Sequence, residues 1–185
     1  MMDLLHFWVW ISALAVLTAA AVPADLERDI IPTSRGDLEI TFIGHGTLMF
    51  AWQGLVIHID PISRDGTDYS RFPKADLILI THEHGDHLDS AAVALLKKEG
   101  TEILYAAKCA EKMPGGTVMK NGEARTAKGL AVEAVPAYNI VNMRSPGMPF
   151  HPRGEGNGYV LTLGGKRIYV AGDTENTPEM KALEA

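Results

Sequence analysis

The chain has 185 residues, 46% of them hydrophobic and 22% charged, and this composition predicts one globular domain with a substantial core. The formal net charge is −6 and the lysines and arginines form no basic stripe, which disfavours a nucleic-acid-binding surface that neutralises phosphates. The single cysteine, Cys109, excludes an internal disulfide and a multi-cysteine zinc cluster, and we interpret it as a small buried residue rather than a nucleophile.

The first 24 residues differ from the rest of the chain. They are almost entirely apolar from Phe7 to Val22, and the segment ends in small residues that include Ala24. This pattern predicts a signal peptide at residues 1–24, and therefore an exported protein of the periplasm or the extracellular space, with no stable membrane span after cleavage. Because Asp3 is present before the apolar run and Lys and Arg are absent, an uncleaved anchor and a buried N-terminal helix are the alternatives.

Short runs of β-forming residues follow a polar stretch at residues 25–37, which we interpret as a linker. The first three runs are 38–43, 47–52 and 55–59. Glycine-containing breaks separate them, so we expect two tight hairpins. The next run, residues 76–81, is continuously apolar, which is typical of a central strand that is buried on both faces.

A helix is predicted at residues 89–98, with Asp89 or Ser90 as its cap and Gly100 beyond its end. The later elements are strands at 102–106, 117–120 and 129–135, a hairpin of 158–163 with 166–171, and a helix over 177–184. Many strands with few helices indicate a layered α/β fold with mixed sheets.

The stretch between these later strands, residues 138–157, has little periodic pattern. Loops of this length in compact domains are usually functional or disordered. Met143, Met148 and Phe150 of this loop either line a substrate pocket or anchor the loop to the domain.

Four candidate metal ligands, His82, His84, Asp86 and His87, lie within six residues directly after the central strand. In an extended or turn geometry, the first two histidines can face one ion while the other two ligands face a second. Neutral imidazoles suit zinc, manganese or iron, and a carboxylate adds a charged ligand. Gly85 permits the tight backbone path between the two pairs. The segment therefore predicts a metal centre.

Residues 82–87 resemble the H-x-H-x-D-H signature of the metallo-β-lactamase superfamily, and the chain is most similar to its UlaG-like hydrolases. Asp60 ends a segment that looks like the strand carrying the family's first acidic residue. Asp173 ends a later segment that looks like the strand carrying the aspartate that bridges two metals. The resemblance covers residues 38–181. It implies an α/β fold of four layers, the αβ/βα sandwich, formed by residues 38–185, with the C-terminal part of the domain missing.

The resemblance also implies an activity. A water held between two divalent metal ions, zinc or alternatively manganese or iron, would attack an ester, lactone, amide or phosphodiester bond of a small-molecule substrate. The implied metal ligands include Asp173 as the bridge. Asp86 and Asp60 would take catalytic roles, and Asp60 would act by orienting a ligand histidine. An iron-dependent oxidative enzyme and a truncated, non-catalytic metal-binding remnant are the alternatives.

Two departures from the family pattern concern histidines. The family's third histidine for the first metal has no counterpart at the end of the strand near residue 137. We expect His151 to replace it as a metal or substrate ligand, and an ordinary loop residue is the alternative. The family's last histidine, beyond Asp173, also has no counterpart, so the chain resembles a member that is shortened at its C-terminus. Of the two remaining candidates, His58 is expected in the core, and His45 could reach the site.

Overall fold

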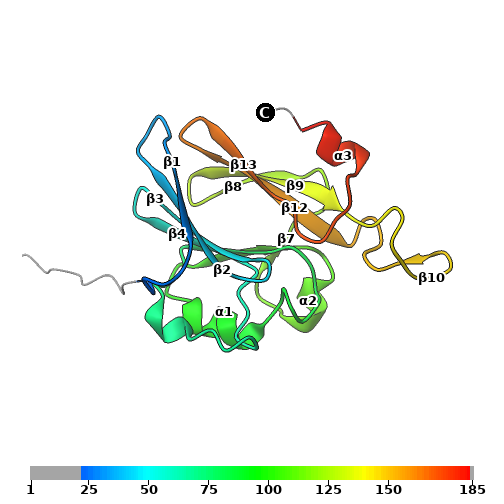
Figure 1. The fold of residues 1–185 in the computed structure, drawn as a ribbon, viewed down its shortest axis with the longest axis horizontal. Helices are drawn as coiled ribbons and strands as arrows, with labels where there is room; N and C mark the ends of the chain where they lie inside the picture. Colours follow the sequence, from blue (N-terminus) through cyan, green and yellow to red (C-terminus); the bar gives the residue numbers. More distant parts are fainter. Residues whose placement is uncertain (1–21, 184–185) are drawn as a thin grey trace, which may run out of the picture.

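The computed structural model describes residues 22–183, so most of the predicted signal peptide lies outside the described residues. Two β-sheets pack face to face, and short helices cover the outside (Figure 1). The predicted α/β class is confirmed by this arrangement. The larger sheet has seven strands in chain order: β1 Arg28–Ile31, β2 Leu38–Gly44, β3 Thr47–Trp52, β4 Leu55–Ile59, β5 Leu77–Ile80, β6 Glu102–Tyr105 and β7 Thr117–Val118. Strands β1 to β4 pair antiparallel, and β4 to β7 pair parallel.

The second sheet has four antiparallel strands in the order β13-β12-β9-β8. Their bounds are β8 Ala124–Ala127, β9 Leu130–Ala137, β12 Gly156–Leu163 and β13 Lys166–Val170. Between β9 and β12 the chain forms a separate small hairpin of β10 Met143–Ser145 and β11 Met148–Pro149. The loop predicted at residues 138–157 therefore contains this hairpin and the beginning of β12.

The helices are short. They are η1 Tyr69–Arg71, α1 Ser90–Leu96, α2 Cys109–Lys112 and α3 Pro178–Lys181. Figure 1 shows α1 and α2 on the outer face of the seven-stranded sheet, whereas α3 lies near β9. The carboxylate of Asp89 caps α1 by accepting hydrogen bonds from the N–H groups of Ala91 and Ala92, as predicted for one of the two candidate caps. No helix within residues 22–183 is long and apolar enough to cross a membrane.

Strand β5 shows how the sequence pattern produces the two cores. Leu77 and Leu79 pack in the core between the two sheets, whereas Ile78 and Ile80 pack in the core beneath the helices. All four side chains are fully buried. Successive residues of a strand point to opposite faces, so a continuously apolar strand has to be covered on both faces. The predicted buried central strand is confirmed.

Several predicted boundaries differ from the structure; for example, the helix predicted at 89–98 ends at Leu96, and the strand predicted at 117–120 ends at Val118. The stretch interpreted as a linker, residues 25–37, contains β1, which pairs antiparallel with β2 from Arg28–Thr41 to Ile31–Leu38. This edge strand is mostly exposed, so its sequence shows no alternation of apolar residues. The helix predicted over 177–184 ends at Lys181.

The topology brings four chain segments to one edge of the two sheets. Strands β4 and β5 are parallel, so the residues after each of them leave at the same edge. Strands β9 and β13 both run antiparallel to β12 and therefore run in the same direction. The edges of the two sheets are joined there, because Asn157 N donates a hydrogen bond to Thr81 O at 2.9 Å. A Cβ atom on Gly172 would lie 3.0 Å from Thr81 Cβ, so glycine permits this close approach.

Candidate metal centre

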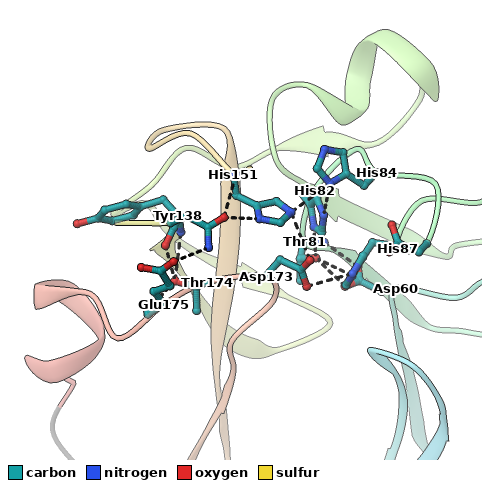
Figure 2. Close-up of polar contacts among 12 residues, drawn as sticks. Asp60, Thr81, His82, His84, His87, Tyr138, His151, Asp173, Thr174 and Glu175 are labelled. Carbon is teal, nitrogen blue, oxygen red and sulfur yellow. Dashed lines mark hydrogen bonds and ion pairs between the residues drawn. The ribbon is translucent and has the colours of Figure 1, made fainter. Parts of the chain in front are cut away.

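Figure 2 shows side chains from these segments converging at the joined edge. The loop after β5 supplies His82, His84 and His87, the loop before β12 supplies His151, and Asp173 follows β13. Among the residues that the structure describes, three groups of candidate ligands have donor atoms within 4.8 Å of one another: His82, His84 and His151; His82, His87 and Asp173; His45, Asp86 and His87. The structure thus brings all six predicted metal ligands into these groups and adds His45.

The first group consists of three imidazoles. His84 Nδ1 lies 3.1 Å from His82 Nε2 and 3.1 Å from His151 Nε2. Burial and the nearby His87 lower the pKa of His82 to about 3, and burial also lowers the pKa of His151. Both rings are therefore neutral at pH 7, which is the form that binds a metal ion.

The other ring nitrogens of this group show which atoms carry protons. Asn139 Oδ1 accepts a hydrogen bond from His151 Nδ1 at 2.7 Å. Thr81 Oγ donates its own hydrogen to the carboxylate of Asp60. It therefore accepts a hydrogen bond from His82 Nδ1 at 3.0 Å. Both Nε2 atoms then present lone pairs to His84 Nδ1, which carries at most one proton. A cation among the three nitrogens would bind all three lone pairs, so the residues fit a metal ion.

A buried carboxylate supports the second group. Asp60 follows β4 with a φ of 46°, and it accepts hydrogen bonds from Thr81 N at 2.7 Å and Thr81 Oγ at 2.6 Å. Asp60 Oδ2 also lies 2.8 Å from His87 Nδ1. Burial raises the pKa of Asp60, and the bonds from His87 and Thr81 oppose that rise. The Nδ1 proton of His87 is thus held by Asp60, and Nε2 is left to face the site.

His87 Nε2 is buried and has no hydrogen-bond partner among residues 22–183, although Asp173 Oδ1 lies 3.2 Å away. The other oxygen of Asp173 lies 3.3 Å from His151 Nε2, so this carboxylate stands between the first two groups. Burial disfavours a charge on His87, yet the carboxylates of Asp173 and Asp60 raise its pKa to about 10. His87 in turn lowers the pKa of Asp173 to about 2. These surroundings favour positive charge at this point, so a metal cation that displaces the proton on Nε2 would fit between His87 and Asp173.

His45 and Asp86 form the exposed side of the third group. His45 Nε2 lies 3.2 Å from Asp86 Oδ2, and about half of each side chain is exposed. The His45 ring centroid is 5.3 Å from that of His87. The glycine after His45 allows this approach, because a Cβ on Gly46 would lie 3.0 Å from His87 Cε1. The sequence signal for His45 was its place in a glycine-flanked turn.

Other candidate residues have different positions. His58 lies in the core, where its Nε2 is 3.1 Å from the carbonyl oxygen of Pro73. Cys109 is buried at the start of α2, and burial raises the pKa of its thiol to about 12. Phe150 lines a small pocket beside His82 and His151, whereas Met148 is exposed in the β10–β11 hairpin.

Sequence reasoning missed the residues that support His151. Asn139 contacts its ring, and Glu175 accepts hydrogen bonds from the loop that begins at Asn139. Hydrogen bonds from the N–H groups of that loop lower the pKa of Glu175 to about 2, and the N–H group of Asn142 has the largest effect. Single asparagines and glutamates outside a motif carry no signal in one sequence, so only the structure could identify them.

Comparison with known proteins agrees with this geometry. Residues 39–185 match the family model described as the beta-lactamase superfamily domain. A metal-dependent hydrolase from Anaeromyxobacter sp. (strain K) is 32% identical over 167 residues, which cover 81% of this chain and 61% of that protein. A metal-dependent hydrolase from Thermus thermophilus is 34% identical over 156 residues, covering 79% of this chain and 66% of that protein.

A solved structure is also similar. The crystal structure of a candidate metal-dependent hydrolase from Parabacteroides distasonis has a TM-score of 0.79 and 48% identity, covering 85% of this chain and 71% of that one. The chain spans about 61% of the length of the first curated relative that it matches. The family match over residues 39–185, with the histidine and aspartate residues of its site, shows that the chain belongs to the metallo-β-lactamase superfamily.

Proposed function

We propose that the protein is a metal-dependent hydrolase that cleaves an ester, lactone, amide or phosphodiester bond in a small molecule. The observation that carries this proposal is the convergence of three imidazole nitrogens, from His82, His84 and His151, beside the carboxylate of Asp173. Relatives named metal-dependent hydrolases support the reaction class.

The donor atoms suggest two divalent cations, and zinc suits a set of imidazoles with carboxylates. Such ions, when bound, lower the pKa of a water molecule and polarise the bond to be cleaved. The three imidazoles of the first group would hold one ion, and His87 and Asp86 would hold the other. Asp173 directs one oxygen toward His87 and the other toward His151, and it would therefore contact both ions.

The proposed roles of Asp60 and Asp86 follow from how deeply each side chain is buried. Asp60 is buried next to His87 and accepts hydrogen bonds from Thr81 and His87, so its role is to orient the His87 ring. Asp86 is about half exposed and reaches solvent, so it can orient a water molecule that attacks the substrate. Asp86→Asn would therefore lower the rate, and Asp60→Asn would act mainly through the affinity of His87 for a metal.

A pocket of about 280 Å³ next to the second group supports a small substrate. Its walls combine the apolar side chains of Phe42, Leu48 and Val170 with the polar groups of His87 and Asp173. The apolar side chains would contact the non-reacting part of a substrate, and the scissile bond would lie at the candidate metal groups.

The test is metal analysis followed by turnover. The purified protein is stripped with a chelator, reloaded with zinc, manganese or iron, and assayed with a generic ester, a lactone and a phosphodiester. We expect zinc-dependent hydrolysis that His82→Ala abolishes and that the distant surface variant Glu133→Gln retains. Oxygen-dependent turnover with iron alone would favour the oxidative alternative. A folded chain that holds no metal would overturn the proposal.

A further inference from the structure

The side chain of Glu175 is hydrogen-bonded to the loop that follows β9. Its carboxylate accepts five hydrogen bonds from that loop, at distances of 2.6 to 3.1 Å. The donors are the backbone N–H groups of Ile140, Val141 and Asn142 and the side-chain amides of Asn139 and Asn142. One half-buried carboxylate thus fixes the path of four consecutive residues.

The side chain of Asn139 connects Glu175 to His151. Its Nδ2 donates to Glu175 Oε1 at 3.1 Å, and its Oδ1 accepts from both N and Nδ1 of His151, at 3.0 and 2.7 Å. Backbone hydrogen bonds join the same segments, because Glu175 N donates to Tyr138 O and Asn139 N donates to His151 O. Figure 2 shows Glu175 and His151 on this side of the site.

The chemistry of the three groups fixes the direction of each bond. A carboxylate only accepts, so the amide nitrogen of Asn139 has to face Glu175. The amide oxygen then faces His151, and it requires a proton on His151 Nδ1. A neutral ring has one such proton, so Nε2 carries a lone pair, and Nε2 is the atom that lies 3.1 Å from His84 Nδ1 and 3.3 Å from Asp173 Oδ2.

We propose that Glu175 is a positioning residue that sets the tautomer and orientation of His151 through Asn139. This proposal rests on the proposed function for its consequence, which is that His151 presents Nε2 to a cation. Groups that hold the second nitrogen of a metal-binding histidine commonly change metal affinity by about 10- to 100-fold when they are removed. Glu175 lies two residues beyond Asp173, so one short segment would supply a ligand and orient another.

Glu175→Gln tests the proposal, because glutamine can donate as well as accept and no longer fixes the Asn139 amide. The first measurement is the ring ¹⁵N chemical shifts of His151 in metal-free protein. We expect wild type to show a protonated Nδ1, and the variant to show a substantial fraction with Nε2 protonated. The second measurement is zinc affinity by chelator competition, and we expect a loss of about 10-fold in the variant.

Two further variants separate positioning from general damage to the loop. The first is the double variant Asn139→Asp with Glu175→Gln. Its new carboxylate at position 139 would accept from His151 Nδ1, and the new amide at position 175 would donate to that carboxylate. This variant should restore the wild-type tautomer of His151 and the wild-type zinc affinity. The matched control is Glu179→Gln, since Glu179 accepts from Tyr138 Oη and pairs with Arg153 but does not contact Asn139. We expect the control to match wild type.

The results decide the two proposals separately. A wild-type tautomer and wild-type zinc affinity in Glu175→Gln would overturn the role of Glu175. In a His151→Gln background, Glu175→Gln should cause no additional loss of affinity, and a full additional loss would also overturn it. If wild type binds no zinc, the proposed function fails, whereas the tautomer in metal-free protein still decides whether Glu175 orients His151.

Discussion

Asp60 Oδ2 lies 2.8 Å from His87 Nδ1, and both side chains are almost completely buried. The same carboxylate accepts two hydrogen bonds from Thr81, the last residue before the histidine cluster. The end of β4 therefore determines how the loop after β5 presents a ligand, although Asp60 and His87 are 27 positions apart in the sequence. This relationship explains why an acidic residue that is almost completely buried belongs to the site.

Asp60→Asn tests this relationship. Asparagine tolerates a positive φ, so the backbone at this position should remain unstrained. Its amide group has one oxygen in place of two, so it cannot accept from Thr81 N, Thr81 Oγ and His87 Nδ1 in the same geometry. We expect the affinity for the zinc ion that His87 would bind to fall by about 10- to 100-fold, measured by competition with a chelator. Unchanged affinity would show that Asp60 does not orient His87.

His84→Ala removes the Nδ1 atom that lies 3.1 Å from both other nitrogens of the first group, those of His82 and His151. We expect loss of tight zinc binding in elemental analysis of the dialysed protein. Because a bound ligand stabilises only the folded state, zinc at 1,000 times its dissociation constant adds about 4 kcal/mol to wild type. The variant should lose that increase, while the unfolding free energies of the two proteins in chelator should be similar. Full metal content in the variant would contradict the assignment of this site.

The sequence predicted the regular parts of the fold for physical reasons. Strands β3 and β4 have the predicted bounds, because glycine-containing turns mark their ends. Strand β5 could be identified from continuous apolar residues. Strand β1 could not, because three of its four residues are exposed and local pattern does not report pairing with β2. The short elements α2, β8, β10 and β11 also lack enough residues to show a period.

The residues of the candidate site also fall into those that the sequence could predict and those that it could not. The dense run from His82 to His87 could be found by counting ligands, and His151 was the one histidine available downstream. The structure shows what one sequence cannot, namely that Asn139 and Glu175 approach His151 across loops. It also places His45 beside Asp86, where the sequence left its position open.

His58 gives a pH-dependent prediction. Burial lowers the pKa of His58 to about 4 from 6.5, opposed by its bond to Pro73. Between these values the unfolded chain binds a proton that the folded chain does not, so stability falls as pH decreases from 6.5 towards 4. The contribution is about 3 kcal/mol at most. We expect His58→Gln to lose less stability than wild type between pH 7 and pH 4.5 in urea unfolding with chelator. Parallel losses would contradict the lowered pKa.

Export gives another prediction. We propose that residues 1–24 are removed as a signal peptide, on the apolar character of that segment and the small residues before Asp25. Expression of the full chain in a secreting bacterial host should yield a protein in the envelope fraction with a mature N-terminus near Asp25, measured by intact mass. Replacing two leucines of the segment by arginine should abolish processing. A cytosolic protein that retains Met1 would contradict export.

The last prediction concerns His45, on the exposed side of the third group. His45→Gln keeps a polar side chain but removes the nitrogen that lies 3.2 Å from Asp86 Oδ2. If His45 joins Asp86 and His87 around a cation, the variant should bind its second zinc about 10-fold more weakly and keep its first. Titration with cobalt, followed by its visible absorption, counts both sites. Gln53→Ala is a matched control, because Gln53 also has a positive φ in a hairpin turn but lies outside the site. Two unchanged binding steps in His45→Gln would limit the ligands of the second ion to Asp86, His87 and Asp173.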